Sequence, residues 1–149
     1  MTPEQRFQQD IECIEFHLSE FHNVMVHFEK GGADEYWYDP ENPEDPGDIV
    51  INSSNSIFHQ LVVLLHEAGH VELRSDKEKY KETFPDSSRD FMGGRVEILK
   101  EEVMAWQKAW ELGKAYGVVD SEFFDLEAWK KNYRRALMLY SNWVAKGDK

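Results

Sequence analysis

The sequence predicts an α+β protein in which a small antiparallel sheet packs on three or four helices. Apolar residues recur every three or four positions in several long stretches, a spacing typical of helices with one buried face. Short segments rich in β-branched and aromatic residues lie between the first two of these stretches and indicate strands. Because 149 residues with 41% hydrophobic content suit one core, we expect residues 1–149 to form a single domain.

The N-terminal part of the chain predicts a helix followed by a β-hairpin. The helix covers residues 3–21, since Pro3 suits a first helical turn and apolar residues follow at helical spacing. Residues 24–28 and 35–38 each indicate a strand, and a Gly-Gly pair between them is a turn signal, so the two strands are expected to pair. Residues 39–47 contain three prolines and a glycine, which predict a loop.

The middle of the chain predicts a third strand, a long helix and a polar loop. Residues 48–52 (Asp-Ile-Val-Ile-Asn) have the composition of a strand. Residues 53–56 offer several candidate N-cap side chains, and a helix is expected to follow over residues 57–73. Residues 75–88 are polar and charged and contain Pro85, which indicates a loop or lid with one irregular turn.

The C-terminal part predicts two more helices. One covers about residues 94–116 and ends at Gly117, because glycine commonly follows a helix. The other begins near Asp120 or Ser121 and presents one apolar stripe to the rest of the protein. The residues of this stripe are Phe124, Trp129, Tyr133, Ala136, Leu137, Tyr140 and Val144.

The charge of the chain argues against nucleic acid as a partner. The formal net charge is −12, from 29 acidic against 17 basic residues, and such a field repels a phosphate backbone. No basic stripe with interleaved aromatic residues occurs in the sequence. The same charge favours a basic substrate or partner, or it serves solubility alone.

Cysteine content and hydropathy predict a soluble protein of the cytoplasm. Cys13 has no second cysteine to pair with, and no export signal is evident, which together favour a reducing compartment. The apolar run at residues 61–65 is far too short to span a membrane. Cys13 itself is expected to be a small buried residue of the first helix.

The segment His66-Glu67-Ala68-Gly69-His70 has the spacing of a metal site. On a helix, residues four positions apart project from the same face, so both imidazoles can reach one ion. Zinc lowers the pKa of a water molecule towards neutrality, and Glu67 beside the histidines is placed to accept its proton as general base. The segment therefore predicts a zinc site with His66 and His70 as ligands and Glu67 as the catalytic residue. Two incidental histidines on a surface helix are the alternative.

A third protein ligand is expected on the helix at residues 94–116, because a catalytic zinc site has three protein ligands and one open position. Glu102 lies within an apolar stripe, where a carboxylate is costly to bury without a cation or hydrogen-bond partners. Glu101 has more mixed neighbours, so Glu102 is the predicted third ligand and Glu101 stays open as the alternative. A solvated helix face is the structural alternative for both glutamates.

These motifs resemble the gluzincin metallopeptidases. His66 to His70 is followed, 32 positions after His70, by Glu102 in the segment Glu-Val-Met-Ala-Trp, which is similar to the Glu-x-x-Ala context of that group. Within the group, the chain looks most like the compact ImmA/IrrE-type metallopeptidases and related phage or mobile-element proteins. The likeness covers roughly residues 47–113, and it implies a zincin-like fold whose active-site helix carries the two histidines.

The chain departs from the pattern of these relatives at two positions. Many carry a second acidic residue directly before the alanine of the glutamate motif, where this chain has Met104, and an Asn or Asp after it, where it has Trp106. The carboxylate expected to orient a ligand histidine is therefore not assigned by the motif. Asp90, Glu97 and Glu101 are the candidates.

The resemblance implies a zinc endopeptidase that hydrolyses peptide bonds of a protein or peptide substrate. Two other classes of function stay open. One is a non-catalytic binding or regulatory protein of phage or mobile-element type that keeps the metal for structure, in which case Glu67→Gln should change nothing. The other is a metal-free interaction protein, whose stability a chelator would not alter.

Several supporting features follow from the same hypothesis. Zincin-like enzymes hold the substrate along an edge strand, for which residues 48–52 are the candidate, although an interior strand is equally compatible with them. Gly69 weakens the helix, which indicates a close packing contact at that position. The residue that stabilises the oxyanion is not determined by the sequence. The candidates for it are Tyr80, Tyr133, Tyr140, Arg134, His22 and His27.

Overall fold

The chain forms five helices and three strands within residues 1–39, 41–42 and 44–147, the part described by the computed structural model. In chain order these are α1 (Pro3–His22), β1 (Met25–Glu29), β2 (Glu35–Trp37), β3 (Asp48–Asn52), α2 (Ile57–Ser75), α3 (Lys77–Thr83), α4 (Met92–Ala115) and α5 (Leu126–Lys146). The predicted α+β class is confirmed. Of the predicted loop at 39–47, Pro40 and Pro43 lie outside the described residues, and the others belong to no helix or strand up to Gly47.

The three strands form a mixed sheet in the order β1-β3-β2. β3 lies in the middle, parallel to β1 and antiparallel to β2, so the predicted hairpin between β1 and β2 is wrong and the sheet is not purely antiparallel. The Gly31-Gly32 segment, which was expected to form the hairpin turn, instead lies next to the end of β3, where the Gly31 N–H donates to the side chain of Asn52. Ile49 and Ile51 of β3 are fully buried, and the middle of a sheet is the position best suited to bury them.

Helix α1 begins and packs as its sequence predicts. The Thr2 side chain accepts from the Gln5 N–H and the Gln5 side chain accepts from the Thr2 N–H, which completes a capping box around Pro3. Ile11 and Ile14 face the core and are buried. Cys13, expected to be buried, is exposed, because it lies on the outer side of the helix between these two residues.

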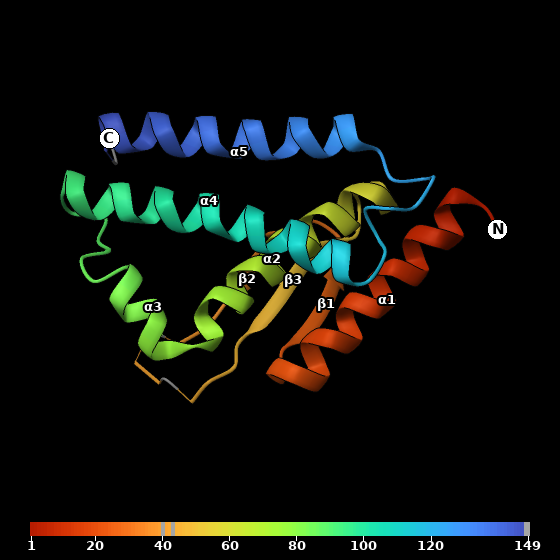
Figure 1. Ribbon diagram of the computed structural model, residues 1–149, viewed down its shortest axis with the longest axis horizontal. Helices are drawn as coiled ribbons and strands as arrows, with labels where there is room; N and C mark the ends of the chain where they lie inside the picture. The colour runs from red at the N-terminus through yellow and green to blue at the C-terminus, as the bar shows by residue number, and fades with distance from the viewer. Residues whose placement is uncertain (40, 43, 148–149) are drawn as a thin grey trace.

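Helix α2 lies at the centre of the molecule, where it packs against α1, α4 and the sheet (Figure 1). Of the four candidate caps before it, Ser56 accepts from the His59 N–H at 3.2 Å. Leu61, Leu64 and Leu65 are fully buried, as expected for a helix with neighbours on several sides. Because α2 is packed on several sides, the His-Glu-x-x-His segment that it carries has a fixed position in the fold.

At Gly69 the backbones of α2 and α4 lie close together. A Cβ atom at this position would lie 2.0 Å from the backbone oxygen of Ala105, so no other residue fits without moving one of the helices. The close packing contact predicted at Gly69 is therefore confirmed. It brings the histidines of α2 next to the glutamates of α4.

The second half of the chain differs from prediction in where its helices begin. Residues 77–83, expected to contain only an irregular turn, form the regular helix α3, which is capped by Asp76 through the Lys79 N–H. α4 begins at Met92, two residues before the predicted start. α5 begins at Leu126, because Asp125 caps it through the Ala128 N–H and the preceding residues form turns.

Helices α4 and α5 run alongside each other (Figure 1) and are joined by aromatic side chains. The rings of Trp106 and Trp129 meet edge to face with centroids 5.1 Å apart, and Trp110 contacts Trp129 at 5.9 Å. Across the described part of the chain, no helix combines the length and the hydropathy needed to cross a membrane.

Candidate metal centre

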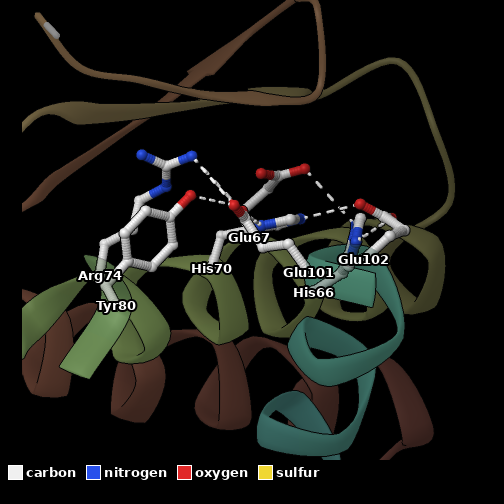
Figure 2. A network of polar contacts seen from close by, with 7 residues as sticks. All are labelled: His66, Glu67, His70, Arg74, Tyr80, Glu101 and Glu102. Carbon is white, nitrogen blue, oxygen red and sulfur yellow. Dashed lines mark hydrogen bonds and ion pairs between the residues drawn. The ribbon is translucent and has the colours of Figure 1, made fainter. Parts of the chain in front are cut away.

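Three side chains of α2, those of His66, Glu67 and His70, lie together on the side of the helix that faces α4 (Figure 2). The two imidazole rings come from successive turns, and their centroids are 4.9 Å apart. Each histidine side chain is 15% exposed, so both are shielded from bulk water but reachable. Glu67 Oε1 lies 3.5 Å from His66 Nδ1. The arrangement is the one that the spacing of the segment predicts.

Glu102 of α4 faces both histidines. Its Oε1 lies 2.6 Å from His66 Nε2, and its Oε2 lies 3.1 Å from His70 Nε2 (Figure 2). One ligand atom from each of these three residues lies within 4.8 Å of the others. The side chain of Glu102 is only 3% exposed. A carboxylate buried to this extent is costly unless it has charged or hydrogen-bonding partners, and the two histidines are such partners.

Two of these atoms lack a hydrogen bond although they are buried and close together. Among the described residues, His66 Nε2 and Glu102 Oε1 are two of the three buried side-chain N and O atoms without a hydrogen-bond partner. Their 2.6 Å separation brings a nitrogen and a carboxylate oxygen together in a geometry that a hydrogen bond does not satisfy. Because both carry lone pairs, a cation between them would satisfy both. The donor set therefore fits a metal ion.

Glu101 contacts the other side of His70. Its Oε2 lies 2.7 Å from His70 Nδ1, which leaves Nε2 directed at Glu102. Arg74 donates to Glu101 Oε1 at 3.2 Å, and the Tyr80 hydroxyl donates to the same oxygen (Figure 2). A carboxylate on the Nδ1 of a ligand histidine fixes the orientation of the ring. Glu101 thus has the place of the orienting carboxylate that the motif left unassigned, whereas Glu97 instead accepts from the Asp86 N–H.

Burial and close charges shift the pKa values of these groups in opposite directions. Burial raises the pKa of Glu67, against the effect of the two histidines. Burial disfavours the charged form of His70, but its contacts with Glu101 and Glu102 outweigh this and raise the pKa of His70 to about 10. Burial also acts to raise the pKa of Glu102, yet its contacts with His66 and His70 hold that pKa below its usual value.

Trp106 also belongs to this site, which sequence reasoning did not recognise. Its ring stacks on His66 with centroids 4.2 Å apart and planes 9° from parallel. The same ring contacts Trp129 and Tyr133 of α5. Trp106 therefore holds the His66 ring in place while it belongs to the core. Its position four residues after Glu102, one turn along the helix, was the signal that could have found it.

A cavity of about 680 Å³ opens over the two histidines. Its walls come from α2, α4, β2 with the segment before it, the residues after α3, and Tyr140 of α5. β2 pairs with β3 along one side only, so the edge strand beside the site is β2. Residues 48–52, the candidate for that edge, are the middle strand, because the hairpin that would have placed them at an edge does not form.

The positions of the candidate oxyanion-stabilising residues show which of them line the cavity. Tyr140 lines the cavity, whereas the hydroxyl of Tyr80 is engaged with Glu101. The others lie in different surroundings. Tyr133 contacts Trp106 between α4 and α5, Arg134 lies over Tyr133, His22 contacts Glu72, and His27 contacts Asp48.

Comparison with known proteins identifies the family. The model of the IrrE N-terminal-like domain of the Peptidase_M78 family matches residues 19–106, from the last turn of α1 to the part of α4 that carries Glu101 and Glu102. No curated protein and no solved structure matches the chain. The matched segment contains the sheet, α2, α3 and all three residues of the candidate metal centre. Since it also covers more than half of the chain, the protein belongs to the Peptidase_M78 family, a family of metallopeptidases.

Proposed function

We propose that the protein is a zinc-dependent endopeptidase. The observation that carries this proposal is the convergence of His66 Nε2, His70 Nε2 and the Glu102 carboxylate on one point, with Glu67 beside it. Two imidazoles and one carboxylate that leave a fourth position open are the ligand set of catalytic zinc sites in peptidases. The membership of the chain in a peptidase family supports the same reaction.

In this proposal the metal ligands and Glu67 have different roles in hydrolysis. His66, His70 and Glu102 would hold the zinc ion, which would supply a Lewis acid for the water molecule and for the carbonyl group of the peptide. Glu67 accepts a proton from the attacking water and passes it to the amine nitrogen as the C–N bond breaks. Its buried carboxylate suits this role, because burial raises its pKa and so strengthens its affinity for the proton.

The substrate is an extended peptide that pairs with the free edge of β2. Within the described residues β2 bonds to β3 alone, and the segment from Ala33 to Tyr36 lines the cavity over the histidines. Main-chain pairing along that edge would place a peptide carbonyl above the metal centre independently of the peptide's sequence. Basic peptides are the preferred class, because the formal net charge of −12 favours their approach.

Tyr140 is expected to donate a hydrogen bond to the oxyanion. Burial and the nearby charges of Glu102 and Glu67 raise the pKa of Tyr140 to about 12, so its hydroxyl keeps its proton at neutral pH. Tyr140→Phe is therefore expected to lower kcat roughly 10²–10³-fold, as for other oxyanion donors, with zinc affinity unchanged. Steady-state kinetics beside zinc titrations check this. Tyr133→Phe, outside the cavity, is the control, and equal losses in the two variants would exclude the assignment.

Removal of the metal tests the proposed function as a whole. A chelator is expected to abolish cleavage of a mixed peptide library, and added zinc is expected to restore it, because no other described group in the cavity takes over the role of a Lewis acid. Mass spectrometry of the products reports cleavage and its position. Cleavage that persists at full rate after the protein has lost its zinc would overturn the proposal.

A further inference from the structure

A second group of metal-binding side chains lies between α1 and α2, away from the peptidase site. It consists of His17 and His22 from α1 and Glu72 from α2, with one ligand atom of each within 4.8 Å of the others. His17 Nε2 lies 2.5 Å and His22 Nε2 lies 2.8 Å from the same oxygen, Oε1 of Glu72. We propose that these three residues form a second site for a divalent metal ion, for which Zn²⁺ is the best match.

This group is separate from the metal centre described above. Glu72 follows His70 by two positions, which on a helix turns its side chain roughly 200° away from that of His70. It therefore lies towards α1, whereas His70 lies towards α4. A metal held by Glu72, His17 and His22 would join the C-terminal end of α1 to the back of the helix that carries the peptidase site.

The chemistry of the group suits zinc. Two imidazole nitrogens and one carboxylate oxygen are borderline ligands, and three of them leave a position for water. The side chains of both histidines are 14% exposed and that of Glu72 is 26% exposed, so the ligands are held by packing but can be reached. His22 also lines a surface cavity of about 330 Å³, which gives an ion a path to the site.

Neighbouring groups orient the ligands and favour a cation. The hydroxyl of Tyr116 lies 2.7 Å from His17 Nδ1, and by accepting the Nδ1 proton it would leave Nε2 free to bind a metal. His22 is the last residue of α1, where the carbonyl end of the helix carries partial negative charge. Asn23 then ends the helix in the left-handed conformation, with φ of 55°.

Zinc titration of a chain without the peptidase site tests the proposal. In the His66→Ala variant, calorimetry with Zn²⁺ is expected to find one remaining site per chain. Adding Glu72→Gln, which keeps the size of the side chain but removes its negative charge, should abolish that site, whereas His27→Ala, which removes a histidine next to Asp48, should not. Tyr116→Phe should weaken binding roughly 10–100-fold, as loss of an orienting group does. Absence of zinc binding in His66→Ala, or binding that survives Glu72→Gln, would overturn the proposal.

Nuclear magnetic resonance of the histidine rings gives a test that needs no variant. On addition of zinc to the wild-type chain, the Nε2 resonances of His17 and His22 should move to the values of metal-bound nitrogen, and Nδ1 of His17 should keep its proton. Unchanged His17 and His22 resonances at saturating zinc would exclude the second site. If zinc does not bind at the peptidase site, the resonances of His66 and His70 will stay unchanged. The experiment therefore tests the two proposals independently.

Discussion

Replacing Glu67 with glutamine is expected to lower the rate of peptide hydrolysis by roughly 10²–10⁴-fold and to leave zinc binding unchanged. Glutamine has nearly the same size, but its amide cannot accept the proton of the attacking water. The side chain is buried beside His66 with 11% exposure, and water is a far weaker base than its carboxylate. Glu67 lies 3.5 Å from His66 Nδ1, whereas the Nε2 atoms of both histidines face Glu102, and for this reason the metal ligands should stay in place.

Single-turnover cleavage and zinc content, measured on the same preparations, check this prediction. Glu111→Gln, a change on the exposed side of α4 where the carboxylate pairs with Lys108, is the control and should keep full activity. A Glu67→Gln variant as active as the wild type would show that the metal serves structure or binding and not catalysis. Loss of zinc together with loss of activity would make Glu67 a ligand.

The second prediction with a large effect distinguishes the roles of Glu101 and Glu102, the two adjacent glutamates of α4, in zinc binding. Glu102→Gln is expected to remove zinc from the peptidase site, because Glu102 is the carboxylate that faces both Nε2 atoms. Glu101→Gln should keep zinc with roughly 10–100-fold lower affinity, since it removes only the partner that orients His70 through Nδ1. The loss for Glu102→Gln should exceed that for Glu101→Gln.

Zinc affinity in metal-buffered solution is the measurement. All chains should also carry Glu72→Gln, so that the second site proposed between α1 and α2 does not contribute. Circular dichroism controls for folding, because both glutamates are buried and their loss could loosen the contact between α2 and α4. The reverse order of affinities would make Glu101 the ligand and Glu102 its supporting residue.

Local signals in the sequence predicted the parts of the site that lie on one element. His66, Glu67 and His70 share a helix, so their spacing alone determines that they face the same way. The close contact at Gly69 was also predictable. A glycine inside a helix weakens the helix, so its presence there indicates a packing reason. Glu102 was favoured over Glu101 on its apolar neighbours, and the structure brings it to both histidines.

Features that depend on long-range pairing could not be read from the sequence. The strand with two fully buried isoleucines, β3, lies in the middle of the sheet, and the local turn signal at Gly31 does not report this order. The contacts of Glu101 with Arg74 and Tyr80 join three elements whose relative positions are unknown before the fold. The stacking of Trp106 on His66 has the same cause, since both rings must first be brought together by the contact at Gly69.

The position of bound zinc tests the central claim most directly. Anomalous diffraction at the zinc edge, from crystals grown with zinc, should show a peak about 2.0–2.2 Å from His66 Nε2, His70 Nε2 and an oxygen of Glu102. Glu67 should lie beside that peak without binding the ion. Absence of a peak at this place in crystals that contain zinc elsewhere, or a peak bound by Glu67 or Glu101 in place of Glu102, would contradict the account.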